Sequence, residues 1–462
     1  MRSLALLSPT PTVLAQRATR GPRYTSYPPA PHFRPSFGNP EAKEALAAAY
    51  PSAKESGISF YAHIPFCSKL CWYCGCNVLI TRDRSRGRTY VDTLLKEFAL
   101  YQKELEGCGL AELSLGGGSP NFLDKADLRR LVLGIKELFP AQDSAVLGIE
   151  LDPRETTEEQ VRVLAEIGFR RLSVGVQDFD EGVQETINRH QSYEQTADLV
   201  KYARESGFNS AGVDLVYGLP GQTEDSFAKT LVSIVSIAPD RIALFGYAHF
   251  PHVMRHQRLV ERQPIPDLEA RALLLTTAVH LLCEAGYVRV GFDHFALPSD
   301  PLAKAVTEKR LHRNFQGFTV PRGGPLLACG VTGISDTGHA YWQNLTKLDE
   351  WEAAITAGKF PVARGLELTE DDLIRRHLIN RLMCDSVVHF KEMEDAFAIH
   401  FPEYFSYELS QLKKDKYSEL ATVNLKEGSI VPTRVGFELI RNLSMLFDLR
   451  LRGAKPSGTT TI

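Results

Sequence analysis

Residues 61–77 read YAHIPFCSKLCWYCGCN, and this stretch decides how the rest of the chain is interpreted. It holds four of the chain's eight cysteines, directly after a β-like run from Ile58 to Ile64. Thiolates this close together are typical of metal or cluster ligation, because a soft cation compensates for crowding several anionic sulfurs. The spacing C-x3-C-x2-C sets Cys67, Cys71 and Cys74 around one loop and leaves a cubane [4Fe–4S] cluster one protein ligand short.

The fourth cysteine of the stretch, Cys76, lies only two residues beyond Cys74. We therefore expect its side chain to point away from the other three thiols. A structural zinc site usually takes all four ligands from the protein, often as paired C-x2-C units, so the spacing favours the cluster. A zinc site and a group of disulfides remain the alternatives.

Size and composition place the chain among soluble proteins with a large core and a smaller domain, because it has 462 residues with 44% hydrophobic and 24% charged content. A formal net charge of -3 argues against nucleic acid as a partner. No apolar run approaches the ~18 residues that a membrane span needs. With half of the thiols at one locus and the others scattered, we expect a reducing, cytoplasmic location.

From Ile58 onward, short apolar β-branched runs alternate with charged helical stretches, which predicts repeated βα units and a parallel sheet. The predicted strands are Ile58–Ile64, Glu112–Leu115, Val146–Leu151, Arg171–Val176, Ser210–Tyr217 and Arg241–Tyr247. The predicted helices between them are Thr89–Glu106, Lys125–Leu138, Thr157–Ile167, Tyr193–Glu205 and Glu224–Ile237. This pattern fits either an open doubly wound sheet or an incomplete barrel.

Polar and glycine residues stand near the carboxyl ends of these predicted strands. In strand order they are the cysteine loop, GGGSPN (116–121), Glu150, Gln177, Asp214, and Tyr247 with Ala248. The active-site rim of a barrel is built in this way, whereas a doubly wound sheet concentrates such residues at one switch point. We therefore predict an α/β fold with an incomplete (β/α)6 TIM-like barrel.

The barrel is predicted to be flanked by two further parts. Residues 1–40 are rich in proline and lack periodicity, which indicates an N-terminal arm. Residues 41–360 are predicted to form the catalytic domain, with the partial barrel over 58–250 and an extension after it. Residues 361–455 are predicted to form a small helical C-terminal domain, with 432–449 as its last helix and a disordered tail from 452 onward.

Several rim residues suit a polar ligand. The backbone amides of Gly116–Gly118 can approach a ligand closely because no Cβ intervenes. Glu150 can accept hydrogen bonds from hydroxyl or ammonium groups, or be an exposed charge at a strand end. Gln177 and Asp214 lie on or beside apolar strands, where an unpaired polar group costs a few kcal/mol, so each has either a ligand or a structural partner. Arg189 can clamp a carboxylate bidentately, or be a solvated charge.

The cysteine stretch resembles the signature of the radical S-adenosylmethionine (SAM) enzymes. In that superfamily three cysteines hold three irons of a [4Fe–4S] cluster, and the amino and carboxylate groups of SAM chelate the fourth. The resemblance implies that one electron from the cluster cleaves SAM into methionine and a 5′-deoxyadenosyl radical. It also implies a protein that fixes SAM and keeps water and oxygen away from the site.

A longer set of motifs resembles the oxygen-independent coproporphyrinogen III oxidases. The motifs are RYTSYP (23–28), SVGVQDFDEGVQETINRHQ (173–191), VDLVYGLPGQT (213–223), YAHFP (247–251), DHFALP (293–298) and LHRNFQGFT (311–319). They extend from about Gly21 into the C-terminal region, so the resemblance covers nearly the whole chain. It implies oxidative decarboxylation of two propionate side chains of coproporphyrinogen III to vinyl groups, giving protoporphyrinogen IX in haem biosynthesis.

The same resemblance implies roles for individual residues. Cys67, Cys71 and Cys74 would ligate the cluster, while Cys76 would be a family feature that is not a ligand. The residues implied to contact SAM, or a second SAM molecule, are Tyr61, Tyr73, Gly117, Gly118, Ser119, Glu150, Gln177, Arg189, Asp214, Ala248 and Ile334. Phe315 and Gln316, together with Tyr61, are implied to be catalytic. At Ser119 the family pattern leads us to expect threonine.

The implied substrate carries four carboxylates and requires basic anchors, for which Arg23 and Arg313 are candidates. A low-potential electron donor and a terminal acceptor are also implied, although the sequence names neither, and a monomer is expected. One alternative is a haem-chaperone relative, but such relatives lack the fourth cysteine and the RYTSYP arm. The other is a non-enzymatic iron–sulfur sensor, which would not need Glu150, Gln177 and Asp214 along a rim.

Overall fold

The computed structural model describes residues 9–321, 323–453 and 458–462, and its central feature is one large sheet with the order β10-β11-β9-β8-β7-β6-β5-β2-β14-β15-β16-β17. The six predicted strands are present as β2 (Ile58–Ile64), β5 (Leu110–Gly117), β6 (Ala141–Leu151), β7 (Phe169–Gln177), β8 (Ser210–Tyr217) and β9 (Arg241–Gly246). These strands pair in parallel in the order of the sequence. A doubly wound sheet would reverse its strand order at a switch point, so the predicted incomplete barrel is confirmed.

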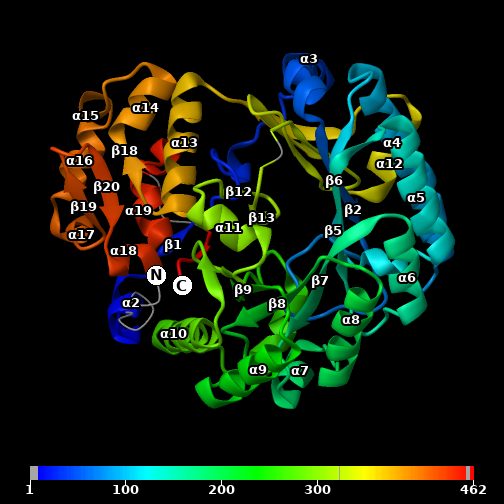
Figure 1. The fold of residues 1–462 in the computed structure, drawn as a ribbon, viewed down its shortest axis with the longest axis horizontal. Helices are drawn as coiled ribbons and strands as arrows, with labels where there is room; N and C mark the ends of the chain where they lie inside the picture. The colour runs from blue at the N-terminus through cyan, green and yellow to red at the C-terminus, as the bar shows by residue number, and fades with distance from the viewer. Residues whose placement is uncertain (1–8, 322, 454–457) are drawn as a thin grey trace.

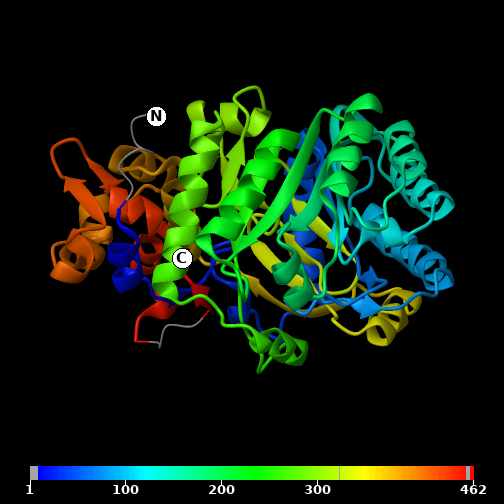
Figure 2. The same ribbon diagram turned by 90° about the horizontal axis from the view of Figure 1, so that it is seen from below.

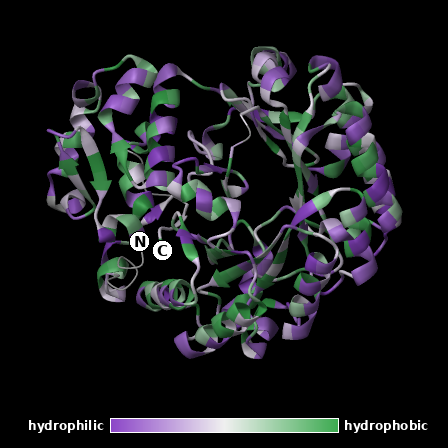
Figure 3. Cartoon of the chain, viewed as in Figure 1, coloured by the Kyte–Doolittle hydropathy of each residue, from purple (hydrophilic) through white to green (hydrophobic). Residues whose placement is uncertain are grey.

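Helices cover the outer face of this sheet, as Figure 1 shows. The predicted ones are present as α4 (Ser85–Glu104), α5 (Lys125–Leu138), α6 (Glu158–Glu166), α8 (Tyr193–Glu205) and α9 (Glu224–Ile237). A further short helix, α7 (Glu181–Ile187), follows β7 and was not predicted. Side-chain N-caps such as Thr157, Ser192 and Thr223 begin three of these helices. Hydrophobic residues concentrate on the strands, while hydrophilic ones mark the outer turns of the helices (Figure 3).

Strands beyond residue 250 extend the sheet at both edges. β14 (Leu326–Cys329) pairs in parallel with β2, and β15 (Ile334–Asp336), β16 (Ala340–Asn344) and β17 (Val362–Glu367) continue antiparallel from it. At the other edge β9 pairs with β11 (His294–Ala296), which pairs with β10 (Val288–Val290). In the part of the chain that the structure describes, β10 and β17 do not pair with each other, so the barrel stays open.

The opening of the barrel faces a hairpin and the C-terminal region (Figure 1). The hairpin consists of β12 (His312–Asn314) and β13 (Gly317–Thr319), whose connecting turn contains Phe315 and Gln316. Its first strand contacts α13 (Glu370–Asp385), the first helix of the C-terminal region. The hairpin therefore lies between the barrel and the C-terminal region.

The C-terminal region is mostly helical, as predicted. Its other helices are α14 (Phe390–Phe397), α15 (Phe401–Tyr404), α16 (Ser406–Leu412), α17 (Asp415–Ser418), α18 (Arg434–Glu438) and α19 (Ile440–Leu446). The single last helix predicted over 432–449 is wrong, because Leu439 leaves the helical conformation and separates α18 from α19. A small antiparallel sheet, not predicted, adds β18 (Val388–His389), β19 (Ala421–Asn424) and β20 (Ser429–Pro432).

The N-terminal arm connects the barrel with the C-terminal region (Figure 2). Its helix α2 (Pro11–Arg17) packs against α10 (Leu268–Glu284) on the barrel side. Its strand β1 (Arg20–Gly21) pairs with β21 (Thr459–Thr460). The predicted disorder of the tail is therefore wrong for this last stretch, while residues 454–457 lie outside the described residues. Local sequence does not reveal this pairing, because the partner strand is more than 400 residues away.

One large cluster of buried hydrophobic side chains includes Leu14 in the arm, Phe60 in the barrel and Phe447 in the C-terminal region. The division into an arm (1–40), a catalytic domain (41–360) and a C-terminal domain (361–455) stays a prediction. Among the described residues, no helix is both long and apolar enough to span a bilayer.

Candidate functional site

The cysteine loop begins where β2 ends, at the carboxyl end of the barrel. Short strands β3 (Phe66–Cys67) and β4 (Leu79–Ile80) pair in parallel and close the loop. The side chain of Asn188 donates a hydrogen bond to the Leu70 carbonyl oxygen at 2.8 Å, and the Trp72 amide donates to the Ile187 carbonyl oxygen at 2.9 Å. The loop is thus held against the segment that follows β7.

A second set of contacts holds the loop from η3 (Arg255–Arg262), a 3-10 helix that follows β9. The buried amide of Gln257 donates to the carbonyl oxygens of Tyr73 at 2.9 Å and Ala248 at 3.1 Å. Nε2 of His256 lies 2.8 Å from the Cys74 carbonyl oxygen. These bonds tie the backbone between Cys71 and Cys74 to the end of β9, where Ala248 lies.

The cysteine side chains are free thiols without disulfides, so the disulfide alternative finds no support here. Cys71 is buried, Cys67 and Cys74 are half-buried, and Cys76 is exposed. The expectation that Cys76 points away from the other thiols is wrong in this structure. Its amide donates to Sγ of Cys74 at 3.4 Å, and the two thiols share a hydrogen bond.

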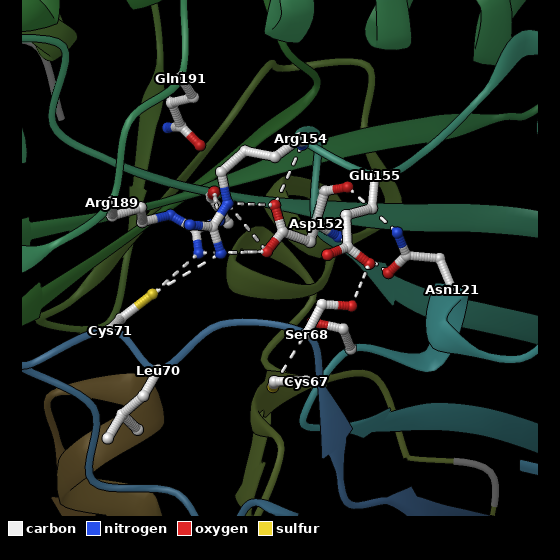
Figure 4. Close-up of polar contacts among 12 residues, drawn as sticks. Cys67, Ser68, Leu70, Cys71, Asn121, Asp152, Arg154, Glu155, Arg189 and Gln191 are labelled. Carbon is white, nitrogen blue, oxygen red and sulfur yellow. Dashed lines mark hydrogen bonds and ion pairs between the residues drawn. The ribbon is translucent and has the colours of Figure 1, made fainter. Parts of the chain in front are cut away.

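Cys71 differs from the other cysteines in its charged neighbours, as Figure 4 shows. Nη1 of Arg189 lies 3.5 Å and Nη2 of Arg154 lies 3.7 Å from its sulfur. Asp152 binds both guanidinium groups, at 2.6 Å from Nη2 of Arg154 and 3.4 Å from Nη1 of Arg189. These two cations hold the pKa of Asp152 below its usual value despite burial, which itself raises it.

The glycine loop after β5 lies beside the cysteine loop. The amides of Gly118 and Ser119 donate to the carbonyl oxygens of Ile64 and Phe66, each at 2.8 Å. A Cβ on Gly118 would stand 2.7 Å from the Phe66 carbonyl oxygen, so this close approach requires glycine. The Ser119 hydroxyl lies 3.6 Å from Sγ of Cys67. The hydroxyl that Ser119 shares with the expected threonine therefore contacts the sulfur.

Two carboxylates face the barrel interior on β6 and β8. Glu150 accepts a hydrogen bond from the Gly117 amide at 3.2 Å, and Asp214 accepts one from the Ser173 hydroxyl at 3.0 Å. Burial raises the pKa of Glu150. Burial and, to a lesser degree, the charge of Glu150 raise the pKa of Asp214 to about 7. The two acids are therefore close neighbours that favour a cationic or hydrogen-bonding ligand.

Tyr61 lies on β2 next to this acidic part of the interior. Burial lowers the pKa of His63 and keeps its ring neutral, with Nε2 donating to the Asn77 carbonyl oxygen at 3.1 Å. Nδ1 is then the acceptor for the Tyr61 hydroxyl at 3.3 Å. Burial and the charge of Glu150 both raise the pKa of Tyr61, so its hydroxyl stays protonated. His63 thus orients Tyr61 and has a structural partner of its own.

Gln177 ends β7 in an unusual conformation, with φ of 72°. The register between β7 and β8 shifts between Gly175 and Gln177, as in a β-bulge. Bulges beside functional sites commonly redirect a side chain, and a positive φ outside glycine is retained only where its surroundings enforce it. This geometry supports the prediction that Gln177 has a ligand-facing role.

Three further predicted residues lie at the hairpin turn and on β15. Phe315 packs with Ile334 of β15 and with Tyr341, whose ring centroid is 6.0 Å away. Gln316 is exposed and lines a cavity of about 360 Å³ together with Ser59, near the amino end of β2. The hairpin turn therefore brings Phe315 close to Ile334 but places Gln316 away from the cysteine loop.

The two proposed anchors for substrate carboxylates differ. Arg313 is buried, pairs with Asp293 at 3.1 Å, and stacks on Phe292 and Phe318. Its charge is already paired with a carboxylate, which favours a structural role, and its role as a substrate anchor stays a prediction. Arg23 is half-buried and donates to the Gly246 carbonyl oxygen at 3.0 Å.

Arg23 belongs to a group of guanidinium groups between the arm, the barrel and the C-terminal region, here called the arginine cluster: Arg23, Arg271 and Arg441. None of the three has an Asp or Glu carboxylate within ion-pair distance in the described part of the chain. Nη1 of Arg271 donates to the Tyr247 carbonyl oxygen and Nη2 to that of Ile462, while its buried Nε has no partner among the described residues. Burial and neighbouring guanidinium groups lower the pKa of Arg23.

The geometry fits an iron–sulfur cluster with a bound cofactor better than a single metal ion. Among the described residues, no group of three His, Cys, Asp or Glu side chains is gathered closely enough to hold one ion, so the zinc alternative finds no support. Nε of Arg189 is buried without a partner in the same part of the chain. An orphaned cationic donor beside the cysteine loop fits an anionic group of a ligand.

Sequence reasoning missed Asp152, Arg154, His256 and Gln257, which all contact the cysteine loop or its partners. Asp152 and Arg154 stand in LDPRE directly after β6, so their position after a strand was the available signal. The signal for Gln257 was absent, because η3 reads as an ordinary charged stretch. The individual roles of all the predicted site residues remain predictions.

Comparison with known families identifies the superfamily. The model of the radical SAM superfamily matches residues 61–234, which run from the middle of β2 through the cysteine loop to the last turn of α9. A [4Fe–4S] cluster and SAM are the cofactors of this superfamily, and the prediction of both is confirmed.

Curated relatives extend the similarity over nearly the whole chain. The oxygen-independent coproporphyrinogen III oxidase of Escherichia coli strain K12 is 40% identical over 94% of this chain and 93% of its own length. The enzyme of the same name from Pseudomonas aeruginosa is 38% identical, covering 93% of each chain. The solved structure of the Escherichia coli coproporphyrinogen III oxidase, described as a radical SAM enzyme, aligns with a TM-score of 0.89 at 39% identity, covering 93% of this chain and 98% of that one. The chain belongs to the oxygen-independent coproporphyrinogen III oxidase family.

Proposed function

We propose that this protein converts coproporphyrinogen III to protoporphyrinogen IX without oxygen, by oxidative decarboxylation of two propionate side chains to vinyl groups. The observation that carries the proposal is the arginine cluster, which adjoins the rim of β9 in a chain of this family. A substrate with four carboxylates needs such cations, whereas a generic radical generator does not. The arginine cluster would supply groups that bind the substrate, and the cysteine loop and the acidic rim suit the cofactors.

The cofactor side of the site follows from the loop and the rim. Cys67, Cys71 and Cys74 would hold the [4Fe–4S] cluster, and Cys76 would not be a ligand. When bound, the cluster and SAM would supply the chemistry that removes a hydrogen atom from the propionate β-carbon. Loss of CO2 and of one electron to a separate acceptor would complete the conversion of the propionate to a vinyl group.

The chain's own residues would bind and orient SAM around this loop. The backbone of Gly117 and Gly118, together with Ser119 and Tyr73, would contact the amino-acid end of SAM. Glu150 and Asp214 would accept hydrogen bonds from ribose hydroxyls or an ammonium group. The contacts with one or two SAM molecules would be completed by Tyr61, Gln177, Arg189, Ala248 and Ile334.

On the substrate side, Arg23 would bind a propionate carboxylate. It makes one hydrogen bond to a backbone oxygen, and its guanidinium has further donors and no carboxylate partner of its own in the described chain. Phe315 and Gln316 would act from the hairpin turn, where Phe315 belongs to a hydrophobic cluster that includes Phe33 of the arm. We also propose that the protein is a cytoplasmic monomer that takes electrons from a low-potential donor and passes one electron per vinyl group to a separate acceptor.

Turnover with the whole protein tests the proposal. The cluster is reconstituted without oxygen, and SAM, a low-potential reductant and coproporphyrinogen III are added. We expect protoporphyrin fluorescence after oxidation of the product, with release of methionine and 5′-deoxyadenosine. Cleavage of SAM without porphyrin product would overturn the substrate assignment, and tight haem binding without turnover would favour the haem-chaperone alternative.

A further inference from the structure

Cys71 is the one cysteine of the loop whose sulfur two guanidinium groups reach in the described structure (Figure 4). Arg189 approaches from the segment after α7, and Arg154 approaches from the turn after β6. By contrast, the sulfur of Cys67 contacts the neutral hydroxyl of Ser119, and the sulfur of Cys74 contacts the amide and thiol of Cys76. The positive charge at the loop is therefore concentrated on a single sulfur.

Asp152 fixes Arg154 in this position. Nε of Arg154 lies 2.9 Å from Oδ1 of Asp152 and Nη2 lies 2.6 Å from Oδ2, which is the bidentate geometry of an arginine–carboxylate pair. The same carboxylate accepts a hydrogen bond from the Arg154 amide at 3.0 Å. The Asp152 amide in turn donates to Oδ1 of Asn121 at 3.2 Å. Arg154 is thus held on a rigid turn, and the same Nη2 that binds Asp152 also reaches the sulfur.

The charged side chains around the sulfur of Cys71 have a net charge of +1. Arg154 and Arg189 are cations, and Asp152 is the carboxylate paired with both of them. Glu155 is occupied by Ser68 and by Arg84, each at 3.0 Å, and does not contact the sulfur. A reduced cluster carries one more negative charge than an oxidised one, and hydrogen bonds and cations at a ligand sulfur stabilise that added charge.

From this geometry we infer that Arg154 raises the reduction potential of the [4Fe–4S] cluster by donating a charge-assisted hydrogen bond to Cys71, with Asp152 as its positioning residue. The inference rests on the proposed role of Cys71 as a cluster ligand. It assigns Arg154 to the electron-accepting step and not to the binding of SAM or substrate. Loss of Arg154 therefore makes the cluster harder to reduce even when SAM is absent.

A potentiometric titration of the reconstituted protein without SAM, followed by the electron paramagnetic resonance signal of the reduced cluster, tests this. For Arg154→Gln we expect the reduced form to be disfavoured about tenfold, which is a fall of about 59 mV for one electron. For Asp152→Asn we expect a more positive shift in the Arg154→Gln background than in the wild type, because loss of the carboxylate removes a negative charge in both but releases Arg154 from the sulfur only in the wild type. Arg154→Lys keeps the charge with a different donor geometry and should give a smaller fall.

Arg84→Gln is the matched control, because it removes one cation beside Glu155 that has no contact with sulfur. Its potential should equal that of the wild type. Equal shifts for Arg84→Gln and Arg154→Gln would overturn the inference, because the effect would then be one of net charge. An unchanged potential with weakened SAM binding in Arg154→Gln would also overturn it, and would make Arg154 a SAM contact.

If Arg154→Gln does not retain iron, Arg154→Lys and Asp152→Asn decide the question. A fall in potential for Arg154→Lys, together with a more positive shift for Asp152→Asn in the Arg154→Lys background than in the wild type, supports the inference, and a wild-type potential for Arg154→Lys overturns it. Turnover of coproporphyrinogen III is not needed for this measurement. Failure of the proposed substrate would therefore leave the test of Arg154 intact.

Discussion

The two sides of the barrel interior carry opposite charge. On β6 and β8, Glu150 and Asp214 face each other closely enough that the charge of one raises the pKa of the other. Arg23 in the arm and Arg271 on α10 bind backbone oxygens at and just after the end of β9 and have no Asp or Glu partner in the described chain. Two acids on one side and two cations on the other thus lie near one another without ion-pair partners in that part of the chain.

The difference teaches that the interior is built for two ligands of opposite character. The acidic side, next to the cysteine loop, suits the ammonium and ribose hydroxyls of SAM. The arginine cluster suits a substrate with several carboxylates. The sides also differ in origin, because the acidic side comes from successive strands, whereas the cluster joins segments from both ends of the chain.

The largest expected effect is on the cysteine loop. Cys71→Ala should abolish both the cluster and turnover, because a cubane held by three thiolates cannot lose one without loss of iron. Iron content and the visible absorbance of the reconstituted protein measure this. Cys76→Ala is the control and should keep an intact cluster, and loss of the cluster in this variant would overturn the count of three ligands.

The two arginines that were expected to anchor substrate should behave in opposite ways. Arg313→Gln should lower the free energy of unfolding by about 3–5 kcal/mol, because it leaves the buried Asp293 with His294 as its one remaining ion-pair partner in the described chain. Arg23→Gln should leave stability nearly unchanged and raise KM for coproporphyrinogen III roughly tenfold, the effect of losing a charged hydrogen bond worth about 1.5–3 kcal/mol. Urea unfolding and steady-state kinetics separate the two. A wild-type KM in the Arg23 variant would show that Arg23 does not bind the substrate, and would contradict a substrate-binding role for the arginine cluster.

The contribution of Asp214 to folding stability should depend on pH, and the substitution Asp214→Asn should remove this dependence. Asp214 has a folded-state pKa of about 7, above its unfolded value, so its stabilising contribution is complete at low pH and is lost as the pH rises to 7. Asp214→Asn should therefore gain stability relative to the wild type as the pH rises from about 4 to about 7, with a constant difference above pH 7. Denaturant titrations of the cofactor-free protein at a series of pH values measure this.

Glu150→Gln is the partner experiment, because removing the Glu150 charge lowers the pKa of Asp214. The gain in stability of Asp214→Asn should then level off at a lower pH, and be smaller in total, in the Glu150→Gln background. A stability difference that does not vary with pH would show that the two acids are not coupled.

The smallest effect is expected at Gln257, which contacts neither the two acids on β6 and β8 nor the arginine cluster. Gln257→Leu should destabilise the protein by about 1–3 kcal/mol, because two carbonyl oxygens, of Tyr73 and Ala248, lose their donor. The rate of iron loss from the reconstituted cluster should rise as the loop loosens. Gln263→Leu, at an exposed position just after η3, is the matched control and should behave as the wild type.

Much of the fold was predictable because local patterns carried it. The strands Ile58–Ile64 and Ser210–Tyr217 and the helices Lys125–Leu138, Tyr193–Glu205 and Glu224–Ile237 were predicted with the observed bounds. Each is an apolar run or an amphipathic helix with turn or capping residues at its ends, so nearby residues determine where it begins and ends. The break at Leu439 and the pairing of β1 with β21 were missed, because tertiary contacts decide them.

By itself, the sequence determined the chemistry at the centre of this protein: three cysteines at cluster spacing, glycines after a strand, and a succession of βα units. These features are local, because they depend on residues that are close together in the chain. Only the tertiary structure decided which charges meet. It paired Arg313 with Asp293, left Arg23 without a carboxylate, and placed Arg154 against the sulfur of Cys71. The physical reason is that the electrostatic role of an arginine is set by the groups around it, and the fold brings those groups from distant parts of the chain.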